Sequence, residues 1–399
     1  MKMDRRSKLI LTAAALFMSA SQSAVVARSV RNPAPAATPP AQGKQTQATA
    51  AVAENLEKVK LILSDGFEAF VKDLNENGRL GYRLEKSLSY GGAGVRQGFA
   101  AVLRLDPGNT YEYDWLSSPS KNLLDLRLNT QARKGFNFAN AFALTFCDDE
   151  RDPDSDTTGP TLSIFRYLKG NAYLVERKNG GTTQTREYKV ISGKIGPRKD
   201  TKKTIEAALA AAPPGFRPVK LLFSKEGWLD FGVTILLEKN LAEGDATKIE
   251  YRLVKEVTGF DKAVNALAAQ GFRFVSGGRV GTINFALMGK QADIATVYTY
   301  FDDEEHAKKF DRTIAQGNRY HALISGEQRC ESLEVVNQKL LFAQAPGGAE
   351  GVYKVFNVFN RKTAKPTADS LAEFQRLLGE GYQVRDLFYS DGLNVIFER

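Results

Sequence analysis

The chain has 399 residues, a formal net charge of +9 and a hydrophobic fraction of 43%. Its two histidines and two cysteines exclude a three-histidine zinc site and a fold that rests on a disulfide framework. Residues 1–53 hold seven basic residues and one acidic residue, a net charge of +6, which leaves +3 for residues 54–399. We therefore expect no nucleic-acid partner, because the basic surplus lies largely outside the part that folds.

The first 27 residues have the order of a secretory signal peptide. Four basic residues precede an apolar stretch at 9–20, and small residues surround Ala27. The apolar stretch is shorter than the roughly 20 residues that a membrane-spanning helix needs. We predict cleavage after Ala27, with Ser23 as the alternative, and a periplasmic or secreted protein. An uncleaved anchor is the competing interpretation.

Residues 28–53 are rich in Pro, Ala, Gln and Thr and show no apolar periodicity. This composition is typical of a flexible tether, which would separate the export signal from the folded part. After residue 28 no apolar run approaches membrane-spanning length, so we expect no transmembrane segment in the mature chain.

From residue 54 onward one pattern recurs: a strand, an amphipathic helix that ends at Gly, and two further strands. In the last copy, 352–359 alternates as a strand does, 369–378 has helical apolar spacing, and strands follow at 382–389 and 393–399. Six glycines mark the helix ends, because Gly accepts the left-handed conformation of a helix C-terminus. These marker glycines are Gly81, Gly135, Gly215, Gly271, Gly317 and Gly381.

The pattern predicts six repeats, at 54–108, 109–184, 185–245, 246–293, 294–346 and 347–399. In chain order, the expected helices cover 67–74, 123–132, 202–212, 260–269, 306–315 and 369–378. The second repeat carries an insertion with extra strand-like runs at 162–168 and 172–177. The predicted fold class is α+β, with tandem β-α-β-β repeats and antiparallel sheets that have helices packed on one face. A single unit buries little apolar surface, so we expect the copies to join edge to edge.

The units resemble a small bacterial domain family of unknown function, with about 50 residues per copy and β-α-β-β order. The residues that carry the resemblance are Tyr353-Lys354-Val355, Leu371, Leu377-Leu378, Gly381-Tyr382-Gln383-Val384 and Phe397-Glu398-Arg399, with Tyr188-Lys189-Val190 repeating the first group. The fifth copy departs from the family's aromatic residue after Gly, since Asn318 follows Gly317. The resemblance implies no catalytic residues.

An acidic run is the candidate metal site. Asp152, Asp154 and Asp156 alternate, so their carboxylates could point into one loop, and oxygen ligands of this kind suit Ca²⁺. Gly159 comes later than the tight-turn Gly of a standard calcium loop, and no Glu follows at the usual distance. A solvated acidic loop is the alternative, and we expect no other cofactor.

The two cysteines stand at similar offsets from marker glycines. Cys147 follows Gly135 and Cys330 follows Gly317 by nearly the same number of residues, so both would lie near the end of an equivalent strand. This predicts a disulfide between the second and fifth repeats in an oxidising compartment; two separate thiols are the alternative. The paired glycines at 91–92, 180–181 and 277–278 are expected to form hairpin turns.

The sequence contains no nucleophile elbow and no metal-type histidine spacing, so it supplies no catalytic residues. The leading prediction is an exported, non-catalytic binding or scaffolding module of the cell envelope with an unknown protein or envelope partner. The alternative is a carboxylate-dependent hydrolase of envelope polymers, whose catalytic carboxylates would converge only in the fold. A structural envelope component is the third reading.

Overall fold

The computed structural model describes residues 58–91, 97–117, 123–144, 170–195, 201–225, 231–243, 249–280, 283–290, 296–301, 306–324, 327–328, 335–336, 339–344, 352–360, 365–389 and 392–399. All structural statements below concern these residues. The predicted signal peptide and tether, Cys147, Cys330 and the acidic run Asp152, Asp154 and Asp156 lie outside them.

Six three-stranded antiparallel sheets account for 18 strands of the described part. The first strands are β1 (Val59–Asp65), β4 (Tyr111–Ser117), β7 (Arg186–Ile195), β10 (Tyr251–Glu256), β13 (Val297–Phe301) and β18 (Tyr353–Asn360). The second strands are β2 (Tyr82–Gly91), β5 (Asn137–Leu144), β8 (Arg217–Lys225), β11 (Phe272–Val280), β14 (Arg319–Ile324) and β19 (Gln383–Tyr389). The third strands are β3 (Gln97–Leu105), β6 (Gly170–Lys178), β9 (Phe231–Asn240), β12 (Ile283–Lys290), β17 (Lys339–Gln344) and β20 (Gly392–Glu398).

In every sheet the third strand lies in the middle, between the first and the second. One helix connects the first and second strands of each sheet; the helices are α2 (Phe67–Arg79), α3 (Leu124–Arg133), α4 (Thr201–Ala210), α5 (Phe260–Ala268), α6 (His306–Ala315) and α7 (Ala368–Gly379). A short strand pair, β15 (Glu327–Gln328) and β16 (Val335–Val336), stands apart from the six sheets. The predicted fold class, tandem β-α-β-β repeats of an α+β protein, is confirmed. We call the sheets with their helices repeats one to six.

The marker glycines end the helices as the sequence predicts. All six have positive φ, between 80° and 91°, a conformation that a side chain disfavours. Four residues after each marker glycine the pairing of the second strand with the third skips one residue, a β-bulge. The bulged residues are Glu85, Ala139, Val219, Val275, His321 and Arg385. A bulge at one fixed offset shows that the six repeats share detailed backbone geometry as well as topology.

Three sequence expectations were wrong. The run 172–177 belongs to β6, the middle strand of the second sheet, so it is no extra strand of an insertion. Gly277 and Gly278 lie inside β11 and form no turn. A Cβ atom on Gly278 would lie 2.3 Å from Cε2 of Phe223 in the preceding repeat, so close packing explains this glycine. Finally, the sheets are separate, and the repeats do not join edge to edge by strand pairing.

The repeats join instead through shared hydrophobic cores. Each of six clusters of buried apolar side chains takes its members from two repeats: one and two, two and three, three and four, four and five, five and six, and six and one. Alternate residues of the middle strands face opposite clusters, as Ala100 and Val102 face repeat six while Ala101 and Leu103 face repeat two. The array of six repeats is therefore closed.

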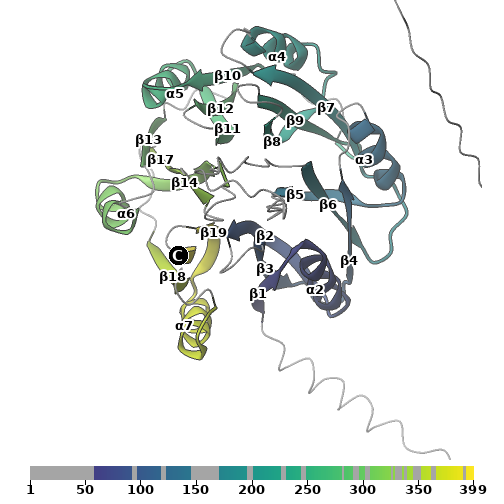
Figure 1. Ribbon diagram of the computed structural model, residues 1–399, viewed down its shortest axis with the longest axis vertical. Coiled ribbons are helices and arrows are strands. Elements are labelled where there is room, and N and C mark those ends of the chain that lie inside the picture. Colours follow the sequence, from purple (N-terminus) through teal and green to yellow (C-terminus); the bar gives the residue numbers. More distant parts are fainter. Residues whose placement is uncertain are drawn as a thin grey trace, which may run out of the picture. The chain divides into compact units, whose positions relative to one another are not determined.

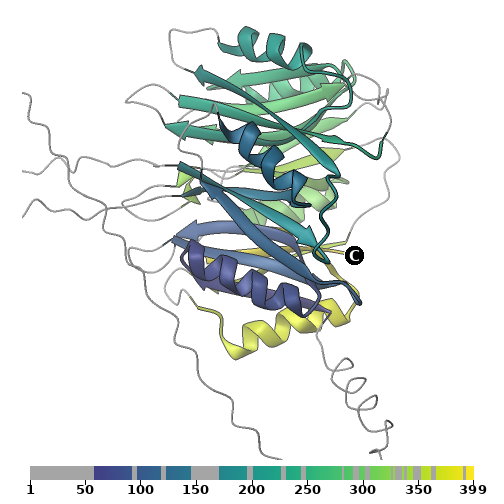
Figure 2. The ribbon, with the colours of Figure 1, turned by 90° about the vertical axis from the view of Figure 1, so that its right-hand side faces the viewer.

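Figures 1 and 2 show the consequence of this closure, with repeats one and six side by side although they are far apart in sequence. The helices lie on the outer side, and the second strands of the sheets lie innermost (Figure 1). We call the contact between two neighbouring repeats a seam and name it by its repeats, so that seam 6–1 closes the array. No helix in the described ranges is long and apolar enough to span a membrane.

Candidate functional site

Each seam needs a polar connection, because the first strand of every sheet is an edge strand with unpaired backbone groups. At seam 1–2, Asn75 of α2 supplies it. Its Nδ2 donates to the Tyr113 carbonyl oxygen at 2.9 Å, and its Oδ1 accepts from the Tyr113 N–H at 2.9 Å. The amide of one side chain thus takes the place of a neighbouring strand.

The same bridge recurs along the array. Asn129 pairs with the backbone of Tyr188 at 2.8 Å in both directions, and Asn265 pairs with Tyr298 at 2.8 and 2.7 Å. At seam 3–4 a carboxylate replaces the amide, and Glu206 accepts from the Leu253 N–H at 2.9 Å. At seam 6–1, Gln375 donates to the Val59 carbonyl oxygen at 3.2 Å. We call this side chain the clamp residue of its seam.

The tyrosine held by the clamp reaches back to the preceding repeat. The Tyr113 hydroxyl accepts from the Leu84 N–H at 2.8 Å, immediately before the bulge at Glu85. The hydroxyls of Tyr188 and Tyr298 accept in the same way from Phe138 at 2.7 Å and from Phe274 at 3.1 Å. The backbone N–H next to the bulge therefore donates to the tyrosine hydroxyl of the following repeat. Each of these three seams has this hydrogen bond in addition to the clamp.

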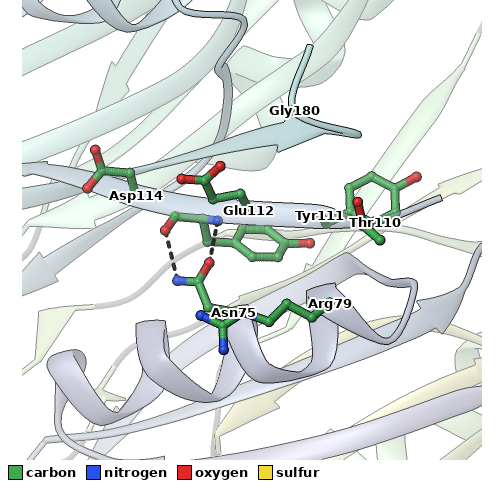
Figure 3. Close-up of a pocket in the computed structure, with 8 residues that line it drawn as sticks. Asn75, Arg79, Thr110, Tyr111, Glu112, Asp114 and Gly180 are labelled. Atoms are coloured by element: carbon green, nitrogen blue, oxygen red, sulfur yellow. Dashed lines mark hydrogen bonds between the residues drawn. The ribbon is translucent and has the colours of Figure 1, made fainter. Parts of the chain in front are cut away.

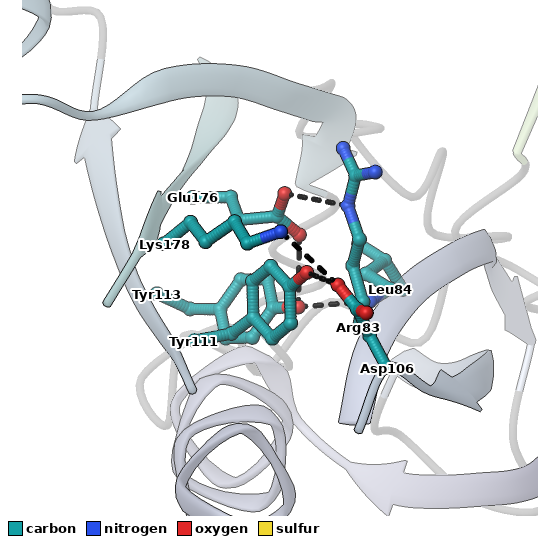
Figure 4. A network of polar contacts seen from close by, with 7 residues as sticks. All are labelled: Arg83, Leu84, Asp106, Tyr111, Tyr113, Glu176 and Lys178. Carbon is teal, nitrogen blue, oxygen red and sulfur yellow. Dashed lines mark hydrogen bonds and ion pairs between the residues drawn. The ribbon is translucent and has the colours of Figure 1, made fainter. Parts of the chain in front are cut away.

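A network of charges surrounds this tyrosine at seam 1–2 (Figure 4). The Glu176 carboxylate accepts from Nε of Arg83 and from the Tyr113 hydroxyl, both at 2.9 Å. Burial, with the nearby Glu176 charge, raises the pKa of Tyr113 well above its usual value, so this phenol stays protonated as a donor. These charged groups connect the two repeats, and both carboxylate oxygens of Glu176 accept a hydrogen bond.

A second group continues the network at the end of the seam. Asp106 accepts from the Tyr111 hydroxyl and lies 3.3 Å from Nζ of Lys178. The hydrogen bond from Tyr111 is the main reason that the pKa of Asp106 lies below its ordinary value. Figure 4 shows that the group of Asp106, Tyr111 and Lys178 lies beside the group of Arg83, Tyr113 and Glu176.

A pocket of about 660 Å³ opens at this seam, and we call it the seam pocket. Its lining residues are Asn75, Arg79, Thr110, Tyr111, Glu112, Tyr113, Asp114 and Gly180. Asn75 and Arg79 stand on α2, while the residues from Tyr111 to Asp114 belong to the strand that faces the helix (Figure 3). The pocket therefore exists only because two repeats meet.

The carboxylates of the seam pocket are already engaged. Glu112 forms an ion pair with Arg177, whose Nε lies 3.1 Å from its Oε2. Asp114 accepts from the Trp115 N–H at 2.8 Å and from the Gln131 side chain at 3.0 Å. Arg79 is exposed and has no ion pair with a described residue. The charge in the pocket that lacks an ion pair with a described residue is therefore that of Arg79.

The second strands carry another polar chain across three repeats. Lys220 donates to Oδ1 of Asn140 at 2.9 Å, and Asn140 donates to Oγ of Ser87 at 2.7 Å. Burial lowers the pKa of Lys220, although Asp386 of repeat six partly offsets the effect. Asp386 itself accepts from the Tyr320 hydroxyl at 2.8 Å. These groups hold the innermost strands together.

The sequence-derived candidate site residues do not coincide with this geometry. The calcium candidates Asp152, Asp154 and Asp156 and the pair Cys147 and Cys330 lie outside the described residues, so both hypotheses stay predictions. Within the described ranges no group of three or more His, Cys, Asp or Glu side chains could hold a metal ion. His321 is a bulge residue beside Phe274 and Tyr298, with ring centroids 5.9 and 5.5 Å away.

The clamp residues escaped the sequence analysis, although the sequence carries a signal for them. Asn75, Asn129 and Asn265 each stand six residues before a marker glycine. Aligning the repeats on those glycines would have shown the asparagines in one column. Their role was missed because the alignment alone does not say that the next repeat brings an edge strand to that side of the helix.

No protein family, curated protein or solved structure matches this chain. The resemblance to a small bacterial β-α-β-β family therefore stays a prediction.

Proposed function

We propose that this chain is an exported, non-catalytic binding module of the cell envelope that takes a polar ligand or partner segment into the seam pocket. The proposal rests on which charged side chains of the pocket already have partners. Both of its acids are held by neighbouring side chains or backbone, while Arg79 is exposed without an ion pair among the described residues. The volume of about 660 Å³ lies within the range of small-molecule sites.

Binding explains the pocket better than hydrolysis does. A glycosidase-type hydrolase needs one carboxyl group to give up a proton and another to attack or to activate water. Glu112 neutralises Arg177, and Asp114 accepts two hydrogen bonds that orient it within the strand. The hydrolase alternative then requires carboxylates elsewhere in the chain. The export part of the proposal rests on the basic and apolar order of residues 1–27.

A pull-down from envelope extract tests the proposal. The mature chain is compared with Arg79→Glu and with Lys72→Glu, which makes the same charge change on the same helix outside the pocket. Lys72 is 76% exposed and pairs only loosely with Glu76 at 3.8 Å. We expect the mature chain and Lys72→Glu to recover the same species, and Arg79→Glu to lose it. Equal recovery by all three chains would refute the seam pocket as the binding site.

The hydrolase alternative has its own readout. Incubation of the mature chain with purified envelope polymer should release no soluble fragments if the chain only binds. Release that continues in Arg79→Glu would support a hydrolase whose active site lies elsewhere.

A further inference from the structure

Four seams carry a tyrosine at the same place, and three of them provide it with a carboxylate. Tyr113, Tyr188 and Tyr353 each pair across their sheet with a glutamate of the middle strand, respectively Glu176, Glu238 and Glu398. The Tyr113 hydroxyl lies 2.9 Å from Glu176, and the Tyr353 hydroxyl lies 2.8 Å from Glu398. Tyr188 also hydrogen bonds to Glu238.

Seam 4–5 lacks that carboxylate. Tyr298 pairs with Ala343, the residue at the position of Glu176, Glu238 and Glu398. The rest of the seam is intact, since Asn265 clamps the Tyr298 backbone and the Phe274 N–H donates to the Tyr298 hydroxyl. The hydroxyl proton of Tyr298 has no acceptor among the described residues, in contrast to the three equivalent phenols.

An arginine is also left without its acid. Arg273 precedes Phe274 as Arg83 precedes Leu84, and both arginines stand two residues after a marker glycine. Nε of Arg83 donates to Glu176. Arg273 has no carboxylate partner among the described residues, and its Nη1 donates to the carbonyl oxygens of Phe272 at 3.0 Å and Ala268 at 3.4 Å. Its Nη2 is buried and has no hydrogen-bond acceptor among the described residues.

We propose that seam 4–5 binds a carboxylate group supplied by a ligand, in the place that the Glu176 side chain fills at seam 1–2. One carboxylate oxygen accepts from the Arg273 guanidinium and the other from the Tyr298 hydroxyl. Charge-assisted hydrogen bonds from a guanidinium suit a carboxylate better than any neutral acceptor. Binding also satisfies a buried N–H that otherwise costs free energy.

Access to this site comes from the edge of the seam. Arg273 and Ala343 both keep partial contact with solvent, and Ala343 carries only a methyl group at the position where the other three seams have a glutamate side chain. The site lies at a different seam from the seam pocket, and the inference does not depend on the proposed binding function.

Calorimetry on the mature chain tests the inference with two probes, acetate and N-acetylated tri-alanine that ends in a free carboxylate. Heats are measured against sodium chloride of the same ionic strength, and the amidated tripeptide is the control without a carboxylate. We expect acetate and the free acid to bind and the amide to give no heat. Equal binding of acid and amide would overturn the carboxylate assignment.

Three variants locate the site. Arg273→Gln should weaken binding at least about tenfold, as expected when a hydrogen bond to a charged group is lost. Ala343→Glu should abolish binding, because its own carboxylate fills the place, and circular dichroism checks that it folds. Glu176→Ala should gain a second acetate site between Arg83 and Tyr113. The inference fails if the unmodified chain binds no acetate, or if its acetate binding is insensitive to Arg273→Gln.

Discussion

Replacing Asn75 by Ala should destabilise the fold through the backbone of another repeat. The change removes both partners of the Tyr113 N–H and C=O, and Tyr113 is only 3% exposed. An unpaired buried backbone group costs about 1–3 kcal/mol, so two groups give about 2–6 kcal/mol. Asn75 and Tyr113 line the seam pocket, so water can reach part of this edge. We therefore expect about 2–4 kcal/mol, toward the lower end of that range.

Urea unfolding of the mature chain measures this loss as a shift of the transition midpoint at unchanged slope. Asn77→Ala is the matched control, because the Asn77 side chain donates to the Asp73 carbonyl oxygen of its own helix at 2.9 Å. A change of this kind normally stays within about 0.5 kcal/mol. Asn129→Ala and Asn265→Ala repeat the test at other seams. If Asn75→Ala costs no more than Asn77→Ala, the clamp contributes nothing and the reasoning fails.

Three other predictions follow from single positions. Gly278→Ala should cost roughly 1–3 kcal/mol of unfolding free energy through overpacking against Phe223, whereas Gly379→Ala, with no atom within 4 Å of its Cβ, should cost nothing measurable in the same urea assay. Burial lowers the folded-state pKa of His321 below 6.5, so the unfolded chain binds more protons and stability should fall as the pH drops through 6.5; a His321→Gln variant that kept the same slope would contradict this. Non-reducing peptide mapping should find Cys147 linked to Cys330, and alkylation of both thiols without reduction would disprove the pairing.

The sequence predicted the repeats because their signals are local. A marker glycine such as Gly81 must take positive φ to end a helix, and the apolar positions of α2 recur at helical spacing, so both features are visible within about 15 residues. The fold class followed from repeating those local features along the chain. The seam pocket was not predictable in this way, since Arg79 and Glu112 belong to different repeats and meet only when the repeats are packed.

The sequence also did not predict that the six repeats form a closed array. Six units that pack by the same kind of contact form an open or a closed array depending on the rotation between neighbours, which no residue pattern specifies. The middle position of the third strand was missed for a related reason. The first strand could pair with either later strand, and β3 is distinguished only by burial on both faces, which an apolar run such as Phe99 to Leu103 suggests but does not prove.

The polar seams explain why closed packing of these repeats is specific. An apolar cluster alone would let two sheets slide, because apolar contacts have no preferred direction. The clamp and the tyrosine add two directional contacts, one to the edge strand and one to the bulge. Seams 3–4 and 6–1 depart from this design, because Leu253 and Val59 have no hydroxyl to reach a bulge. At seam 6–1, Gln375 donates to the Val59 carbonyl oxygen at 3.2 Å.

Aromatic packing takes over part of that role at the closing seam. Tyr90 of repeat one stacks on Tyr389 of repeat six, with ring centroids 5.5 Å apart and planes inclined by 15°. Stacking fixes the distance and tilt of two surfaces but tolerates rotation more readily than a pair of backbone hydrogen bonds. The closing seam therefore combines one clamp hydrogen bond with aromatic stacking, whereas seams 1–2, 2–3 and 4–5 combine the clamp with a tyrosine hydroxyl that reaches the bulge.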